Sequence, residues 1–215
     1  MAKQTQSDNA TIRSKVSLRI KALKELEQPV VMETHGGMGK IWIQCYSHMD
    51  TGVVFEKRPD KASSLALQRP GWAVYETDCE VALRHGVGSH LPINFVDFDP
   101  YGGPWVAIDS FFEGIKPGVP RLVFTVTDGL PVRLKLNTAW ITDGFQDAVD
   151  HFGNARIYHE YAEVCKWLMQ RKAAKAGYIL RRWAWHDNRR PDLGGSGEHP
   201  GEGVVHYAAV MDRAA

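Results

Sequence analysis

Three acidic residues follow short apolar runs of the sequence and could bind a ligand that carries hydroxyl and amino groups. Glu33 and Glu56 stand 23 positions apart, each at the end of an apolar run typical of a buried strand, and Asp78 ends a third run. In dinucleotide-binding folds, a carboxylate about 20 positions beyond a glycine-rich turn accepts hydrogen bonds from ribose hydroxyls. Asp78 could accept a hydrogen bond from an adenine amine. Because open α/β sheets bind ligands at the carboxyl edge of their strands, these acids predict a ligand site at that edge.

A glycine-rich turn, ETHGGMGK at residues 33–40, follows the first of these acids. Gly36, Gly37 and Gly39 allow a tight backbone turn and the close approach of a ligand. A helix that begins after such a turn offers free N–H groups. A tight connection without a ligand is the alternative interpretation. His35 precedes the glycines. We assign it no role in ligand binding and expect it to be a structural residue.

The fourth apolar run ends in VDFDPYGGPW, which places an acid, a proline and an aromatic ring at the same sheet edge. Asp99 and the carbonyl of Pro100 could accept the N–H groups of an amine, and Tyr101 could stack on its ring. Gly102 permits a tight loop after them. Most tryptophans of the chain are expected in the core, but Trp105 directly follows this loop and is expected at a substrate. The segment therefore predicts a site for a planar amine.

Taken together, these motifs resemble those of class I S-adenosylmethionine (SAM) dependent methyltransferases. DPYG at residues 99–102 resembles the Asp-Pro-Pro-Tyr type motif of enzymes that methylate exocyclic amines of nucleic-acid bases. It is similar in particular to the DPFG-x-P loop of the tRNA guanine dimethyltransferases, and VTD at residues 126–128 resembles their Thr-Asp strand end. The resemblance covers about residues 30–128, and the last two predicted strands extend it to Met211.

The resemblance implies SAM as the cofactor and assigns a role to each motif. The residues that would bind SAM are Glu33, Gly37 and Gly39 for its amino-acid part, Glu56 for the ribose, and Asp78 with Cys79 for the adenine. The residues that would carry catalysis are Asp99, Pro100 and Tyr101, with Gly102 and Trp105 at the substrate. An aryl amine is a poor nucleophile, so acceptors at its N–H groups would favour the reactive pyramidal geometry. In-line methyl transfer would depend mainly on positioning and would need no metal.

The order of apolar and helical segments predicts an α/β fold. We expect a doubly wound, Rossmann-like sheet of seven strands, mostly parallel with an antiparallel C-terminal strand. The expected strands are residues 30–34, 52–57, 72–78, 93–99, 121–128, 178–185 and 204–211. The expected helices are residues 12–27, with Ile12, Val16, Ile20 and Leu23 as an apolar stripe, and residues 59–68, 104–113 and 157–177. An N-terminal amphipathic helix (1–28) would precede one methyltransferase domain (29–215), with residues 129–155 as an insertion over the sheet edge or the site.

Composition and charge restrict the function less than the motifs do. Hydrophobic residues make up 44% of the chain and the net charge is +1, which is ordinary for a globular domain. Basic residues outnumber acidic ones in residues 1–27 and 156–190, whereas acidic residues prevail in 28–155. The basic flanks are equally consistent with solvated helix faces and with phosphate contacts. The polar N-terminus and the absence of a long apolar run lead us to expect a cytoplasmic protein without a membrane segment.

The expected function is SAM-dependent methyl transfer to an amine, with the exocyclic amine of an RNA or DNA base as the favoured target. Protein and small amines stay open as targets, and a partner subunit could supply substrate recognition. One alternative is an NAD-binding oxidoreductase that uses the same acidic and glycine-rich strand ends. Another is a non-catalytic SAM-binding partner or regulatory subunit with the same fold.

Overall fold

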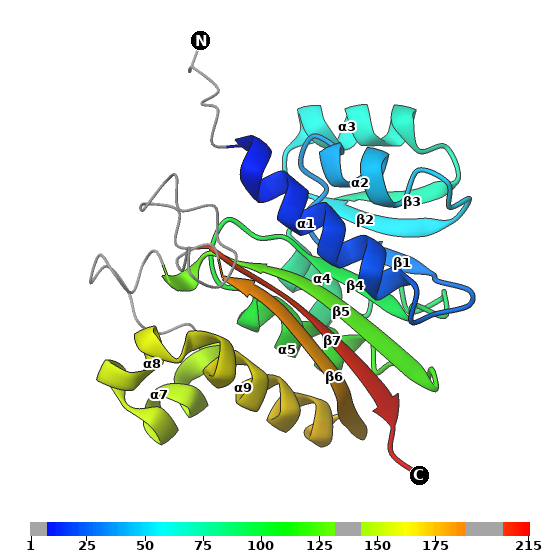
Figure 1. The fold of residues 1–215 in the computed structure, drawn as a ribbon. Helices are drawn as coiled ribbons and strands as arrows, with labels where there is room; N and C mark the ends of the chain where they lie inside the picture. Colours follow the sequence, from blue (N-terminus) through cyan, green and yellow to red (C-terminus); the bar gives the residue numbers. More distant parts are fainter. Residues whose placement is uncertain (1–7, 132–142, 188–203) are drawn as a thin grey trace.

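The computed structural model describes residues 8–131, 143–187 and 204–215, which form a mixed sheet with helices on both faces (Figure 1). The sheet has seven strands in the order β3-β2-β1-β4-β5-β7-β6. The strands are β1 (Val31–Glu33), β2 (Gly52–Glu56), β3 (Trp72–Glu76), β4 (Phe95–Phe98), β5 (Arg121–Asp128), β6 (Tyr178–Asp187) and β7 (Val205–Arg213). The first five pair in parallel, and β7 lies antiparallel between β5 and β6. The predicted fold class is confirmed.

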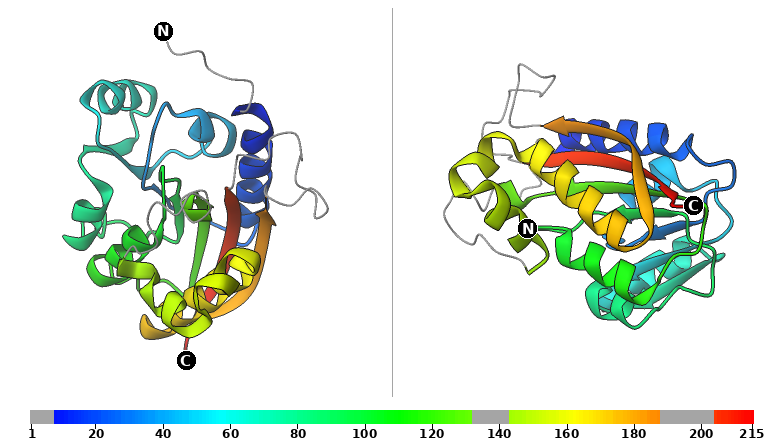
Figure 2. Two further views of the ribbon diagram at one scale, coloured as in Figure 1. Left: turned by 90° about the vertical axis from the view of Figure 1, so that its left-hand side faces the viewer. Right: turned by 90° about the horizontal axis from the view of Figure 1, so that it is seen from below.

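Two groups of helices cover the two faces of the sheet (Figure 2). One face carries α1 (Asp8–Leu23), α2 (Lys40–Cys45) and α3 (Pro59–Gln68). The other carries α4 (Cys79–Arg84), α5 (Trp105–Gly114) and α9 (Tyr161–Lys175). The short elements η1 (Asp143–Phe145), α7 (Gln146–Phe152) and α8 (Asn154–His159) lie beside α5 and α9. Because apolar side chains pack on both faces, the central strands are the near-continuous apolar runs that made them recognisable in the sequence.

Most predicted elements are present with shifted ends. The predicted helix 157–177 is interrupted at Glu160, which separates α8 from α9. Part of the 129–155 segment forms η1 and α7, whereas residues 132–142 and the loop 188–203 lie outside the described residues. No helix in the described ranges is both long and apolar enough to cross a membrane.

The N-terminal helix is attached to the sheet by a buried ion pair as well as by apolar contacts. Arg19 is fully buried, and its Nε and Nη2 atoms donate to the Asp97 carboxylate of β4 at 2.7 and 2.6 Å. The hydroxyls of Tyr46 and Thr125 also donate to this carboxylate, at 2.9 and 3.2 Å. Ile20, which the sequence predicted on the buried stripe, is 41% exposed. The helix therefore turns Arg19 toward the sheet and Ile20 away from it.

A second buried carboxylate closes the carboxyl end of β5. Asp128 is fully buried and accepts hydrogen bonds from the backbone N–H of Leu130 at 2.9 Å and from the hydroxyl of Tyr161 at 2.7 Å. The hydroxyl of Tyr207 lies 3.4 Å away. Burial raises the pKa of Asp128 to about 6, although these hydrogen bonds oppose the rise. Asp128 thus joins α9 and β7 to the end of β5.

We expect the Asp128→Asn variant to lose part of the pH dependence of stability. Because folding raises the Asp128 pKa, its contribution to stability is complete below about pH 4 and is lost as the pH rises through about 6. Relative to the variant, the wild-type free energy of unfolding should fall by about 2 kcal/mol between pH 4 and pH 7. Urea unfolding of both proteins across this range measures the difference. Parallel curves would show that Asp128 does not titrate there.

Candidate functional site

Two adjoining cavities open at the carboxyl edge of the parallel strands. The larger has a volume of about 450 Å³ and the smaller about 120 Å³. His35 and Glu56 line both cavities and therefore mark their junction. The larger cavity is also lined by Ile12 and Lys15 of α1, Glu33, Gly36 and Gly37, and Asp99, Pro100 and Tyr101. The smaller is also lined by Thr34, Asp78, Cys79 and their neighbours.

The structure brings most of the predicted site residues together. Those at the larger cavity are Glu33, Gly37, Glu56, Asp99, Pro100 and Tyr101. Those at the smaller cavity are Asp78 and Cys79, with Glu56 common to both. Gly39, Gly102 and Trp105 line neither of them.

The three glycines of the turn serve three different purposes. Gly37 has φ of 54° and no atom within 4 Å of the position of an added Cβ, so its backbone is open on that side. At Gly36, a Cβ would lie 2.5 Å from Leu65 and 2.6 Å from Val54, so only glycine lets the turn pack this closely. Gly39 has φ of 74° and faces Gln68 of α3 instead of the cavity. Gly39 therefore shapes the entry into α2. Gly36 lines the larger cavity, although the resemblance gave it no role in binding SAM.

Glu56 is the acidic residue at the junction. Its Oε2 accepts the N–H of Gly37 at 2.8 Å, and its Oε1 accepts the N–H of Arg58 at 2.9 Å. Among the described residues, its hydrogen bonds come from backbone N–H groups, and no lysine or arginine side chain forms an ion pair with it. The carboxylate of Glu56 therefore keeps acceptor capacity and negative charge for a ligand.

Glu33 lies in the cavity wall, but its carboxylate already has a cationic partner. Arg69, fully buried, donates to Glu33 from the end of α3. The guanidinium lies between two indole rings, 4.8 Å from the centre of Trp42 and 5.3 Å from that of Trp72. This pair fixes the end of β1 behind the glycine turn.

Asp78 and Cys79 begin α4 at the smaller cavity. Asp78 accepts the N–H of Glu80 at 3.0 Å as the helix N-cap, and Lys57 donates to it at 3.3 Å. Burial alone would raise the pKa of Asp78, but these partners lower it. The Cys79 sulfur lies 3.4 Å from Nε2 of His35. Burial raises the pKa of Cys79 to about 12, so the thiol is protonated at neutral pH.

Asp99 forms an ion pair with the N-terminal helix. The Lys15 ammonium donates to it at 2.9 Å, and the two side chains are 20% and 21% exposed. Burial opposes ionisation of Asp99, but Lys15 and the nearby Arg19 outweigh it and hold the Asp99 pKa well below its usual range. Asp99 is therefore a carboxylate at neutral pH.

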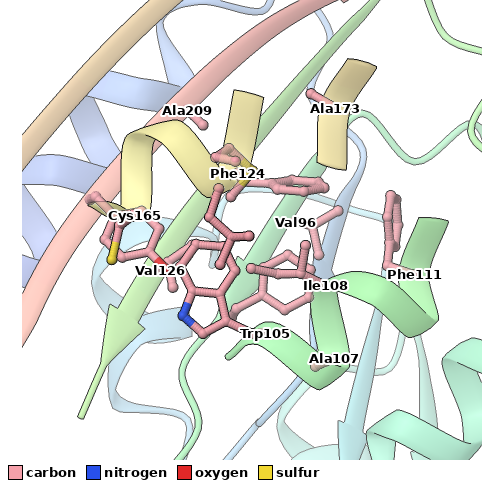
Figure 3. Packing of buried hydrophobic residues seen from close by; sticks show 14 of the residues in the cluster. Val96, Trp105, Ala107, Ile108, Phe111, Phe124, Val126, Cys165, Ala173 and Ala209 are labelled. Carbon is pink, nitrogen blue, oxygen red and sulfur yellow. The ribbon is translucent and has the colours of Figure 1, made fainter. Parts of the chain in front are cut away.

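The remaining predicted residues differ in exposure. Tyr101 is fully exposed at the rim of the larger cavity. The carbonyl of Gly102 accepts the N–H of Gly129 at 3.0 Å, which ties this loop to the end of β5. Trp105 is fully buried among apolar side chains that include Ile108 and Val126 (Figure 3). Its ring stacks on that of Tyr207, with ring centres 6.0 Å apart. The structure therefore places Trp105 in the core, contrary to its expected position at a substrate.

Sequence reasoning missed the contribution of α1 to the site. Ile12 and Lys15 line the larger cavity from a helix that precedes all the recognised motifs. The sequence did contain a signal for this contact, because the spacing of two basic residues on the helix matches the spacing of two acidic residues at the strand end. Lys15 and Arg19 are one helical turn apart, about 6 Å, and Asp97 and Asp99 are two strand residues apart, about 6.6 Å.

Comparison with known proteins identifies the class of fold. No protein family and no curated protein matches the sequence. The structure is similar to that of M. jannaschii TYW2 in complex with AdoMet, with a TM-score of 0.57 and 16% identity over 98% of this chain and 79% of that one. For Trm1 from Pyrococcus horikoshii with S-adenosyl-L-methionine, the TM-score is 0.60, with 12% identity over 95% and 56% of the two chains. For the N-methyltransferase NodS from Bradyrhizobium japonicum, the TM-score is 0.55, with 11% identity over 97% of this chain and 99% of that one.

This chain therefore has the Rossmann-like fold of the class I methyltransferases, with its antiparallel strand β7 in place. It spans 56% of the length of the Trm1 chain and nearly all of NodS.

Proposed function

We propose that the protein is a SAM-dependent methyltransferase that acts on an amine, with the exocyclic amine of a nucleic-acid base as its target. The observation that carries the proposal is the pair of adjoining cavities, with Glu56 at the junction and Asp99 on the wall of the larger one. The similarity to structures that contain AdoMet or S-adenosyl-L-methionine supports the cofactor. The similarity to an N-methyltransferase supports an amine target.

From the smaller cavity to the larger one, the lining residues would suit the adenine, the ribose and the amino-acid part of SAM in turn. Asp78 and the backbone at Cys79 would hold the adenine in the smaller cavity, and Glu56 would accept the ribose hydroxyls. The open backbone of Gly37 and the acidic wall that contains Glu33 would receive the amino-acid part in the larger cavity. When bound, SAM supplies an electrophilic methyl group on a sulfonium.

Asp99 and its neighbours suit the amine side of the reaction. A carboxylate offers about four acceptor sites, and the hydrogen bond from Lys15 uses one of them. Asp99 can therefore accept an N–H of the amine while Lys15 keeps it ionised, and the carbonyl of Pro100 adds a second acceptor. Tyr101 exposes its whole ring at the rim, where a base can stack on it.

Replacing Glu56 should weaken SAM binding. We expect the dissociation constant for SAM to rise at least about tenfold in Glu56→Gln, because the variant loses charge-assisted hydrogen bonds to the ribose. Glu76→Gln is the matched control, since Glu76 pairs in register with Glu56 on β3 but is exposed and lines neither cavity. Isothermal titration calorimetry with SAM measures both. Equal affinities for the two variants would remove Glu56 from the cofactor site.

The target class is tested by incubating the protein with methyl-labelled SAM and total RNA, DNA, protein or small amines. We expect label in a nucleic-acid fraction, and hydrolysis of that fraction should identify an N-methylated base. Label in the protein or small-amine fraction alone would contradict the nucleic-acid target but retain methyl transfer to an amine. Failure of SAM to bind at all would contradict the whole proposal.

One observation favours a second candidate, a SAM-binding subunit without turnover. The Lys15 ammonium already forms an ion pair with Asp99, the residue expected to accept a hydrogen bond from the amine. If this pair closes the site, the wild type should bind SAM and label no fraction, and Lys15→Met should not bind SAM more weakly. The oxidoreductase alternative loses support, because β7 between β5 and β6 departs from the classic 3-2-1-4-5-6 strand order of dinucleotide-binding sheets.

A further inference from the structure

His35 lies at the junction of the two cavities. It is half-buried and lines both of them, as Glu56 does, from the turn between β1 and α2. If the adenine occupies the smaller cavity and the amino-acid part the larger, the centre of the cofactor passes this junction. The imidazole then lies beside the ribose and the sulfur, where the methyl group is carried.

Hydrogen bonds determine which nitrogen of His35 carries its proton. The Thr34 hydroxyl donates to the backbone carbonyl of Asp97 at 3.0 Å. The same oxygen is therefore free to accept the Nδ1–H of His35, at 2.8 Å. Nε2 then carries no proton and can accept the thiol proton of Cys79, at 3.4 Å. The chain of donors fixes a neutral imidazole in one tautomer.

Several charged or titratable groups surround His35. The carboxylates of Asp97, Asp99, Glu56 and Asp78 act on it, and the thiol of Cys79 lies 3.4 Å from its Nε2. The wall of the larger cavity also carries Glu33, Lys15, Lys40 and Lys61, and that of the smaller carries Lys57 and Glu80. Three of the four carboxylates that act on His35 have cationic partners, Asp97 with Arg19, Asp99 with Lys15 and Asp78 with Lys57. Burial outweighs the attraction of the carboxylates and lowers the pKa of His35. The ring is therefore neutral at neutral pH.

We propose that His35 borders the sulfonium position and that its neutral ring allows the site to hold this cation, whereas a protonated ring would repel it. The inference rests on the proposed function. It makes His35 a residue that sets the preference between the cationic cofactor SAM and the neutral product S-adenosylhomocysteine (SAH). Adenine, ribose and amino-acid parts are common to both ligands, so effects of other titrating groups on these parts cancel in the ratio of the two affinities.

The test is calorimetric titration of the full chain with SAM and with SAH at pH 7 and pH 5. In the wild type, we expect the ratio of the SAM to the SAH dissociation constant to rise at least about twofold at the lower pH, because protonation of the ring places a second positive charge near the sulfonium of SAM but near no charge in SAH. His35→Asn keeps a donor for Thr34 but cannot take up a proton, so its ratio should stay constant. His90→Asn, an exposed histidine that lines neither cavity, should behave as the wild type.

The outcomes separate the inference from the function on which it rests. Binding of both ligands with a constant ratio in the wild type would overturn the role of His35 and leave the cofactor assignment intact. The same change of ratio in His35→Asn as in the wild type would also overturn it. Failure of the wild type to bind either ligand would overturn the proposed function and this inference with it. If His35→Asn does not fold, His35→Gln replaces it.

Discussion

The Asp99→Asn variant should transfer methyl groups at least about 100-fold more slowly than the wild type, while its affinity for SAM stays within about threefold. Asp99 is ionised at neutral pH because Lys15 and Arg19 hold its pKa low. The carboxylate can therefore accept an N–H of the amine as positive charge develops on the nitrogen during transfer. The amide of asparagine has a weaker acceptor and no charge, and it loses the ion pair with Lys15.

Asp109→Asn is the matched control for this prediction. Asp109 is also a half-buried carboxylate paired with a lysine, with Lys172 at 2.5 Å, but it lies on α5 and lines neither cavity. Its variant should keep methyl transfer within about twofold of the wild type. Transfer of label from SAM to the responsive fraction, measured beside calorimetric SAM binding, gives both quantities. Wild-type turnover in Asp99→Asn would show that another group receives the amine.

The position of the site followed from the sequence because parallel strands bring their carboxyl ends to one edge. Glu33, Glu56 and Asp99 are far apart in the chain, yet each follows a buried apolar run and all three line one cavity. The apolar runs were long enough to identify the strands, and the order of elements left few topologies. The sheet edge was therefore predictable before any side-chain contact was known.

What each acid does at that edge was not predictable, because it depends on partners distant in the sequence. Glu33 is paired with Arg69, 36 positions later, just after a helix whose packing the sequence does not specify. Trp105 follows the predicted catalytic loop directly, but α5 turns it into the core against Tyr207 from the last strand. Adjacency in the chain was thus a poor guide to exposure.

The role of the N-terminal helix was also not predictable from its own sequence, because it depends on carboxylates of a distant strand. The apolar spacing of the helix predicted a stripe against the sheet, and the excess of basic residues in 1–27 was equally consistent with a solvated helix face and with phosphate contacts. Asp97 determines which face of the helix packs on the sheet, because a buried carboxylate in the middle of β4 needs a cation. The helix supplies Arg19 for Asp97 and, one turn earlier, Lys15 for Asp99. The contact that anchors the helix therefore also places Lys15 in the site.

Breaking that anchor should have the largest effect on stability. We expect Arg19→Met to lower the free energy of unfolding by about 3–5 kcal/mol, because Asp97 is left buried without its cation. Arg182→Met is the matched control, since Arg182 pairs with Glu25 at 2.6 Å on the surface, where an ion pair contributes at most about 1 kcal/mol. Urea unfolding measures both changes.

The double variant Arg19→Met/Asp97→Asn distinguishes loss of the ion pair from loss of packing by the arginine side chain. Without its charge, residue 97 can still accept the hydroxyls of Tyr46 and Thr125, which donate to Asp97 in the wild type. The double variant should therefore recover more than half of the stability lost in Arg19→Met. If the double variant is no more stable than Arg19→Met, apolar contacts hold the helix, and a group other than Arg19 compensates the negative charge of Asp97. Recovery would show that the stability of the fold depends on pairing the buried charge of Asp97 with a cation from α1.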